Sequence, residues 1–164
     1  VVEGVNLENK SFTIEFWTER LSDNVQGVIY AQGNIELGFD ASNRFYATLG
    51  NSTYLSTDTY TSADNWMHWA VTYNYDDNEV AFYMNDVIAL NKTVVSTNFS
   101  PKGRIYFGQA AVGGKNYHGY LHDMRVWEAE RGQGAIVANM STGQRGDEIG
   151  LSGLWPMDEA DGLV

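Results

Sequence analysis

The feature that most constrains this chain is an alternation of apolar and polar residues with a period of two. In the segment 11–18, Phe12, Ile14 and Phe16 fall on every second position. Because successive side chains of a strand point to opposite faces, this period predicts β-structure. The segment 66–75 carries bulky residues on both faces, which indicates a central strand. Strands are predicted at 11–18, 27–31, 35–39, 44–49, 66–75, 79–84, 87–90, 104–108, 117–127 and 153–157.

Turn-forming residues separate these segments. The turn 76–78, with two aspartates and one asparagine, ends the central segment. The pair Asn85-Asp86 suits a tight hairpin, because both side chains tolerate positive φ. Only the segment 131–140 favours a helix, and its two glycines limit that helix to one or two turns. Roughly ten short strands with evenly spaced turns predict an all-β sandwich of two antiparallel sheets, with one short helix near the C-terminus.

The charge balance narrows the classes of partner. The chain has 21 Asp and Glu against 10 Lys and Arg, a formal net charge of −11. A nucleic-acid binder needs a basic face to displace counterions from phosphates, so nucleic acid is excluded as a partner. No segment approaches 18 consecutive apolar residues, which argues against membrane insertion. Cysteine is absent, so disulfides and cysteine nucleophiles are excluded as well.

The length indicates how the chain is organised. Its 164 residues fit a single domain spanning 1–164, large enough for a core without covalent cross-links. The chain begins at Val1 and ends at Val164 with neither a cap nor a tail. We therefore expect a piece excised from a larger protein, with other domains of the parent chain as partners.

Four segments resemble the laminin G-like jelly-roll domains of the concanavalin A-like lectin/glucanase superfamily, a group that includes pentraxin-like domains. The segment 11–17 (SFTIEFW) is similar to their opening strand, and 66–73 (WMHWAVTY) to their Trp-x-His-x-Ala-Val-Thr-Tyr strand. The segment 119–127 (GYLHDMRVW) resembles their Gly-x-Ile-Asp-Glu-Val-Arg-Ile-Trp strand, and 153–159 (GLWPMDE) their closing strand. The family's usual first strand has no counterpart, and we expect it to lie before Val1 or to be missing.

The resemblance implies a concanavalin A-like jelly roll, and the family's members are mostly binding modules. We expect a non-catalytic ligand-binding or adhesion module of an extracellular or cell-surface protein. Carbohydrate is the ligand class that we expect first, and calcium-dependent binding is left open. The alternatives are a structural spacer or protein–protein interaction domain with an extracellular protein as partner, and a divergent glycoside hydrolase. Because a fold does not fix a function, the sites need their own argument.

The residues argue against catalysis. Glucanases of this superfold need an acid and a nucleophile facing each other across the scissile bond, within a Glu-x-Asp-x-x-Glu strand motif. No segment of the chain matches that motif. The closest is Glu159-Ala160-Asp161, which lacks the third carboxylate because position 164 is valine.

Sugar binding calls for flat aromatic faces beside polar groups. Tyr54, Tyr60, Trp66 and Tyr117 lie at predicted strand ends or in turn-rich stretches, and His118 follows the last of them. We take these five residues as candidate ligand contacts, with ordinary packing in the sheet as the alternative for each. Core positions are expected for the other tryptophans, which are Trp17, Trp69, Trp127 and Trp155.

Calcium prefers several carboxylate and carbonyl oxygens. Asp76 and Asp77 give a dense oxygen cluster in one turn, and Asp123 occupies the family's acidic strand position. These three are the candidate metal ligands, and a solvated turn with a strand carboxylate is the alternative. A cross-strand ion pair is predicted between Glu15 and Arg125, which we interpret as structural.

Overall fold

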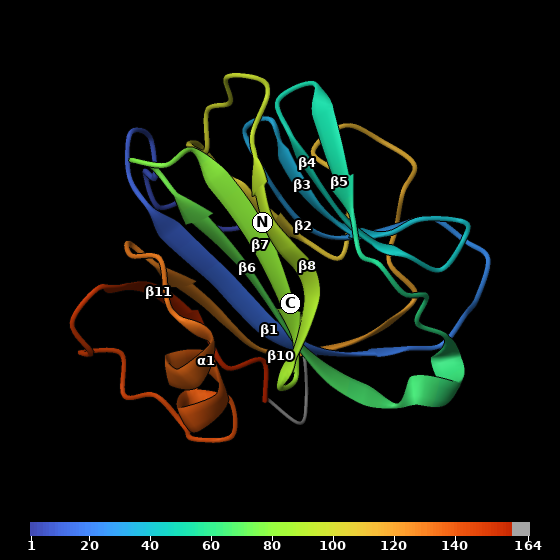
Figure 1. Cartoon of the computed structure of the whole chain (residues 1–164). Helices are drawn as coiled ribbons and strands as arrows, with labels where there is room; N and C mark the ends of the chain where they lie inside the picture. The colour runs from blue at the N-terminus through green and yellow to red at the C-terminus, as the bar shows by residue number, and fades with distance from the viewer. Residues whose placement is uncertain (159–164) are drawn as a thin grey trace.

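The computed structural model describes residues 1–158 and contains two antiparallel sheets packed face to face (Figure 1). The six-stranded sheet has the strand order β11-β10-β1-β6-β7-β8, and the five-stranded sheet has the order β5-β4-β3-β2-β9. The predicted all-β sandwich is therefore confirmed. The bounds are β1 Phe12–Arg20, β2 Gly27–Gln32, β3 Ile35–Phe39, β4 Phe45–Leu49, β5 Ser52–Leu55, β6 Trp66–Asn74, β7 Glu79–Met84, β8 Val87–Val94, β9 Ile105–Phe107, β10 Gly119–Trp127 and β11 Leu151–Trp155, with α1 at Gln133–Asn139 and a 3₁₀ turn at Ser62–Asp64.

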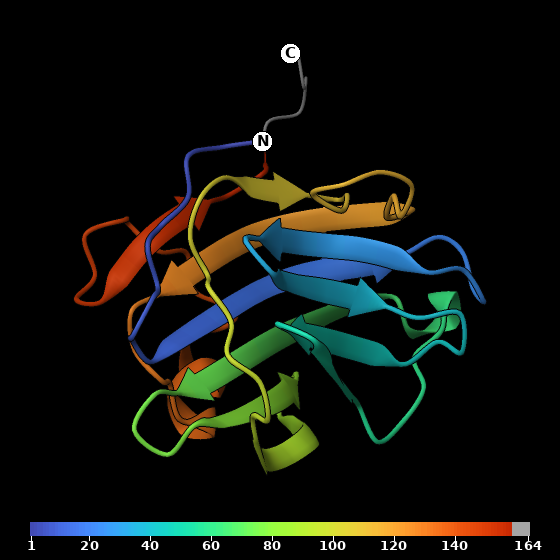
Figure 2. The ribbon, with the colours of Figure 1, turned by 90° about the horizontal axis from the view of Figure 1, so that it is seen from above.

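Figure 2 shows the two sheets from above. The period-two alternation places the apolar side chains on their inner faces, and these side chains form the core between the sheets. Trp69 at the centre of β6 is fully buried and stacks on Phe45 of β4, with ring centroids 4.1 Å apart. Phe39 packs edge-on against both rings. This cross-sheet aromatic contact fixes how the sheets face each other.

The outer face of the six-stranded sheet is partly covered by α1, which lies on the side away from the five-stranded sheet (Figure 1). Ile136 of α1 is fully buried against Ala70, Ala81 and Tyr83. The helix is one short element, as the two glycines predicted. No helix within residues 1–158 has the length and apolar character that crossing a membrane requires.

A buried polar cluster lies beneath this C-terminal segment. Glu15 of β1 is fully buried, and its Oε1 accepts hydrogen bonds from Trp127 Nε1 at 2.6 Å and from Arg131 Nη1 at 2.8 Å. Glu15 pairs with Arg125 across neighbouring strands, and Arg125 Nη1 lies 3.8 Å from Oε1. The predicted Glu15–Arg125 pair is confirmed, and Arg131 is an additional, closer partner. The Nε2 atom of buried His68 lies 3.5 Å from Glu15 Oε2.

Some elements differ from the sequence prediction. The strand β5 was not predicted, because Asn51-Ser52-Thr53 reads as turn chemistry. β10 carries a bulge at Asp123, which has a φ of 54° and shifts the register with β1. Trp17 and Trp155 are only half-buried rather than in the core. The Glu159-Ala160-Asp161 segment lies outside the described residues.

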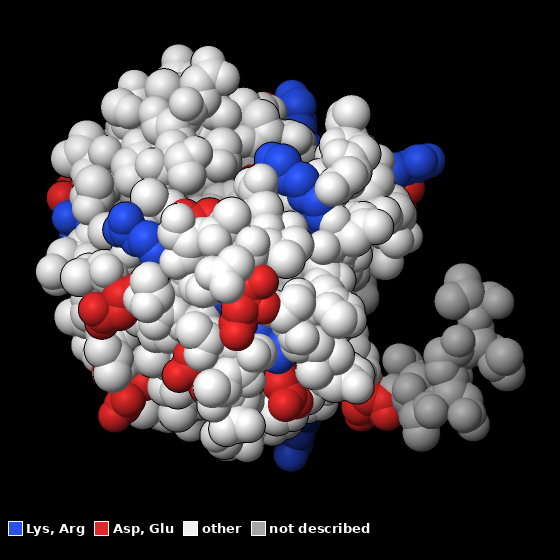
Figure 3. All heavy atoms as spheres, turned by 90° about the vertical axis from the view of Figure 1, so that its right-hand side faces the viewer, with Lys and Arg blue, Asp and Glu red and all other residues white. Residues whose placement is uncertain are grey.

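Charged side chains do not gather into a basic surface on the face seen in Figure 3. Carboxylates are spread over it, and the Lys and Arg side chains stand apart from one another. This distribution agrees with the net charge of −11.

Candidate functional site

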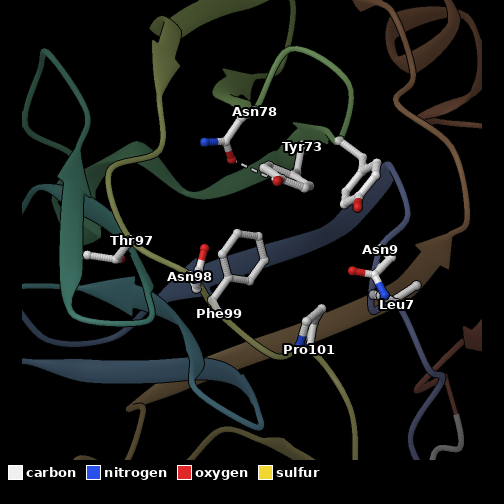
Figure 4. A pocket seen from close by; sticks show the side chains of 9 residues that line it. Leu7, Asn9, Tyr73, Asn78, Thr97, Asn98, Phe99 and Pro101 are labelled. Carbon is white, nitrogen blue, oxygen red and sulfur yellow. Dashed lines mark hydrogen bonds between the residues drawn. The ribbon is translucent and has the colours of Figure 1, made fainter.

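A pocket of about 320 Å³ opens at one end of the sandwich, where three segments distant in sequence meet (Figure 4). The segments are the loop before β1, the end of β6 with the following turn, and the long connection from β8 to β9. We call this hollow the end pocket. Its lining residues are Leu7, Asn9, Tyr73, Tyr75, Asn78, Thr97, Asn98, Phe99 and Pro101.

Backbone hydrogen bonds hold the three segments together. Leu7 N donates to Pro101 O at 3.0 Å, which ties the N-terminal loop to the β8–β9 connection. Val95 N donates to Asn78 O at 2.8 Å, which ties that connection to the turn after β6. The pocket walls are therefore set by the sheet framework, so a ligand would meet a largely formed site.

Aromatic rings form the floor. Tyr73 and Phe99 pack edge-on, with centroids 4.9 Å apart, and Tyr73 is only 6% exposed. Tyr73 Oη donates to Asn78 Oδ1 at 2.8 Å. Burial raises the pKa of the Tyr73 phenol, so it remains a neutral donor. Tyr75, by contrast, is 45% exposed and presents its ring to solvent.

Two amides and a phenol of the pocket are available to a ligand. Asn9 and Asn98 lie on opposite sides of the pocket, with the Phe99 ring between them (Figure 4). Within residues 1–158, the side-chain amides of Asn9 and Asn98 and the hydroxyl of Tyr75 form no hydrogen bond. No charged residue is among the nine lining residues. Neutral donors and acceptors beside exposed aromatic surface suit a polar, uncharged ligand.

The β8–β9 connection rests on the edge of the five-stranded sheet. Tyr54 Oη accepts a hydrogen bond from Ser96 N at 2.9 Å, and Thr97 Oγ1 donates to Leu49 O at 2.8 Å. Gly50, with a φ of 64°, lies so close to the connection that an added Cβ would stand 2.4 Å from Asn98 O. A glycine is needed there both for its φ and for the close approach.

We predict that Gly50→Ala lowers the free energy of unfolding by about 1–3 kcal/mol, because the methyl group displaces the backbone at Asn98. Chemical denaturation measures this change. Gly103→Ala is the matched control, since Gly103 also has positive φ (88°) but no atom within 4 Å of an added Cβ. Equal losses in the two variants would show that φ alone, and not the close contact, is responsible.

The predicted ligand contacts are dispersed. Tyr60 is 6% exposed and packs edge-on against Trp69, so Tyr60 is corrected from a ligand candidate to a core residue. The hydroxyl of Tyr117 lies 2.6 Å from Thr18 Oγ1, and burial raises its pKa to about 12. Tyr54 supports the pocket wall from behind. Trp66 and His118 are exposed but lie on other surfaces of the molecule.

The three predicted metal ligands are not brought together. Asp76 and Asp77 are exposed in the turn between Tyr75 and Asn78, at the rim of the end pocket. Asp123 lies further along the sheet, and both of its carboxylate oxygens accept hydrogen bonds from Arg125. Within residues 1–158, no group of three or more His, Asp or Glu side chains could hold a metal ion.

Sequence reasoning missed Tyr75, Asn9, Asn98 and Phe99 as site residues. Asn9 and Asn98 each begin an Asn-x-Ser sequence, a pattern that does not identify a ligand contact. Tyr75 was assigned to the end of a strand, and the structure places it just beyond β6 in the turn. No local pattern joins these positions, since they meet only through the packing of three distant segments.

The chain matches a family model described as "Concanavalin A-like lectin/glucanases superfamily" over residues 1–137. The curated proteins contain no sequence that matches it. Among solved structures, a Bacteroides ovatus protein for which carbohydrate binding is proposed superposes with a TM-score of 0.80 at 21% identity, covering 96% of this chain and 47% of that one.

Two further similar structures contain bound sugars. The CBM40 of a Ruminococcus gnavus IT-sialidase, bound to α2,3-sialyllactose, gives a TM-score of 0.66 at 11% identity over 84% of this chain and 93% of that one. Domain 4 of an extracellular arabinanase from Geobacillus stearothermophilus, in complex with arabinotriose, gives a TM-score of 0.56 at 13% identity. The match covers 84% of this chain and 68% of that one. At identities this low, the structural similarity establishes the fold alone. The chain spans about half of the Bacteroides protein.

Proposed function

The chain belongs to the concanavalin A-like lectin/glucanases superfamily, and on that premise we propose that it is a non-catalytic carbohydrate-binding module. The end pocket is its sugar site. The observation that carries this proposal is the combination of an exposed ring, Tyr75, with two amides that have no partner within residues 1–158, Asn9 and Asn98. An exposed ring offers a face for the apolar side of a sugar, and amides can both donate to and accept from its hydroxyls.

The charges around the pocket favour a neutral sugar. The lining has no cationic side chain that could pair with a sugar carboxylate. The nearest lysines along the chain are already engaged, Lys10 with Glu128 at 2.6 Å and Lys102 with Glu8 at 2.9 Å. Asp76 and Asp77 at the rim would repel an acidic sugar. We therefore propose neutral oligosaccharides, rather than sialylated or uronic ones, as ligands.

The lining of the end pocket supports a module that binds a sugar without hydrolysing it. Glycosidases place two carboxyl groups about 5–10 Å apart across the bond that they cleave. The described lining of the end pocket has no carboxylate. A second hollow, of about 470 Å³, contains Asp123 and Asp158, but Arg125 engages both oxygens of Asp123. Both oxygens of Asp123 are therefore already engaged within the protein, and its carboxylate does not face Asp158 as a free partner across the hollow.

The length of the similar Bacteroides protein suggests in what kind of protein this chain occurs. The chain covers 47% of the similar Bacteroides protein, and we propose that it is likewise one domain of a larger extracellular or cell-surface protein. In that setting, the module would hold its parent protein on glycans. Calcium is not needed for this proposal, because Asp76 and Asp77 are separated from Asp123.

We predict that Tyr75→Ala weakens binding of neutral oligosaccharides at least about tenfold, or about 1.4 kcal/mol, since the stacking ring is lost. A panel of neutral and sialylated oligosaccharides is titrated calorimetrically against the protein, with EDTA and with added calcium. Leu21→Ala is the matched control, because Leu21 is exposed to the same extent as Tyr75, 45%, and follows the far end of β1.

Three results would contradict the proposal. One is that no neutral sugar on the panel binds. Another is that Tyr75→Ala and Leu21→Ala weaken binding equally. The third is that sialylated sugars bind more tightly than their neutral cores, which would place an unrecognised cationic group at the site.

A further inference from the structure

A second surface with recognition chemistry lies on the outer face of the six-stranded sheet. α1 covers this face at Ala70, which is paired with Glu15. Further along β1, beyond Trp17, Glu19 stands between Trp66 of β6 and Tyr120 of β10, its register partners on either side. We call Trp66, Glu19 and Tyr120 the aromatic row.

The two rings of the aromatic row are exposed and near-parallel. Trp66 is 43% and Tyr120 56% exposed. Their ring planes differ by 26° and their centroids lie 6.4 Å apart, while His122 meets Trp66 edge-on. Large aromatic side chains that lie side by side on an exposed face of a sheet mark a surface that a partner covers. Nothing within residues 1–158 does so.

The carboxylate between the rings has no counter-ion. Glu19 is half-buried, and within residues 1–158 its side chain forms no ion pair and no hydrogen bond. The neighbouring Arg20 is buried on the core side, where it donates to Tyr60 O and lies over the Phe39 ring. Arg131 is also engaged, with Glu15 and the Trp127 ring. A partly desolvated carboxylate without a cation favours a ligand that brings one.

We propose that the aromatic row is a second site, which binds an organic ammonium group. A cation over the space between the rings would lie within about 6 Å of both centroids, the range in which cation–π attraction operates. Glu19 supplies the opposite charge at the same place. A metal ion is a poorer ligand here, because calcium needs several oxygen ligands and the row offers one carboxylate. The shared chemistry is an alkylammonium, carried by an amino sugar or by a quaternary ammonium head group.

This site is independent of the end pocket and does not rest on the proposed function. The test is a titration of the whole chain, followed by the NMR shifts of the Trp66 indole, with three probes: tetramethylammonium, glucosamine in its protonated form, and N-acetylglucosamine. We expect at least one ammonium probe to shift Trp66, and N-acetylglucosamine to leave it unchanged. Glu19→Gln and Trp66→Ala should each weaken ammonium binding at least about tenfold.

The outcomes separate the sources and the two sites. A shift with glucosamine alone identifies an amino sugar, and a shift with tetramethylammonium identifies a quaternary head group. Tyr75→Ala should leave these titrations unchanged, whereas Glu19→Gln should leave neutral-sugar binding at the end pocket unchanged. The proposal is overturned if no ammonium probe shifts Trp66, if Glu19→Gln binds as well as the native chain, or if N-acetylglucosamine shifts Trp66 to the same extent. Thermal unfolding checks that Trp66→Ala folds, and the isosteric Glu19→Gln serves if it does not.

Discussion

Replacing Glu15 with alanine is expected to lower the free energy of unfolding by about 3–5 kcal/mol, the usual cost of removing one partner from a buried ion pair. Glu15 is fully buried and receives hydrogen bonds from Trp127 and Arg131. Without its carboxylate, the guanidinium of Arg131, which is only 12% exposed, and the indole N–H of buried Trp127 lose their acceptor. Urea denaturation measures the change.

Two control variants show whether burial is the cause. Glu15→Gln keeps the shape and an acceptor oxygen but removes the charge, and we expect a smaller loss than in Glu15→Ala. Glu128→Gln breaks the exposed pair with Lys10, where the side chains are 43% and 32% exposed, and should change stability by less than about 1 kcal/mol. A loss in Glu15→Ala as small as that in Glu128→Gln would refute the structural role of the cluster.

The cluster also anchors the C-terminal segment to the sheet. Arg125 donates to the backbone oxygens of Asn139, the last residue of α1, and of Thr142 just beyond it, and Asp123 and Glu15 hold the guanidinium in position. Trp17 Nε1 donates to Met140 O at 2.8 Å in the same region. The helix is short and glycine-rich, so its stability comes from these contacts and from Ile136 rather than from helix propensity.

The sheets were predictable because strand alternation is a local property. The period of two showed which residues of β1 and β6 share a face of the sheet. Once the segments around Glu15 and Arg125 had been identified as strands, their pairing could be predicted. β5 escaped prediction because a four-residue strand rich in Ser and Thr has no alternation to detect. The bulge at Asp123 was also missed, because it depends on the hydrogen bond from its N–H to Pro156 O on the neighbouring strand.

The candidate site was much less predictable. Aromatic residues in turn-rich stretches were equally consistent with ligand contact and with packing, and the structure divides them: Tyr60 is buried, whereas Trp66 is exposed. Exposure depends on which distant segment packs over a residue. Asn9, Tyr75 and Asn98 become neighbours only because Leu7 bonds to Pro101 and Asn78 bonds to Val95. No sequence window contains that information.

Acid is expected to lower the free energy of unfolding through His68. This loss begins at a pH well above the range in which carboxylates titrate. Burial, and then the charges of Arg125 and Arg131, lower the pKa of His68 from 6.5 to about 3. Below pH 6.5 the unfolded chain therefore binds a proton that the folded chain does not. His68 therefore has no effect on stability above pH 6.5. As the pH falls towards 3, it lowers the free energy of unfolding, by about 2 kcal/mol at pH 5 and about 4–5 kcal/mol at the lower limit.

The groups around His68 allow its effect to be isolated. Burial raises the pKa of Glu15, so Glu15 takes up its proton more readily in the folded state and opposes the loss in acid. The carboxyls with lowered pKa, such as Glu8 and Glu128, add to the loss only nearer pH 4. In the interval from pH 7 to 5, the loss at His68 and the opposing proton uptake at Glu15 act together, so the difference between the native chain and a His68 variant isolates His68. Urea denaturation across this interval should show a decline in the native chain and a flatter profile in His68→Gln, whereas equal slopes would assign the acid sensitivity to other groups.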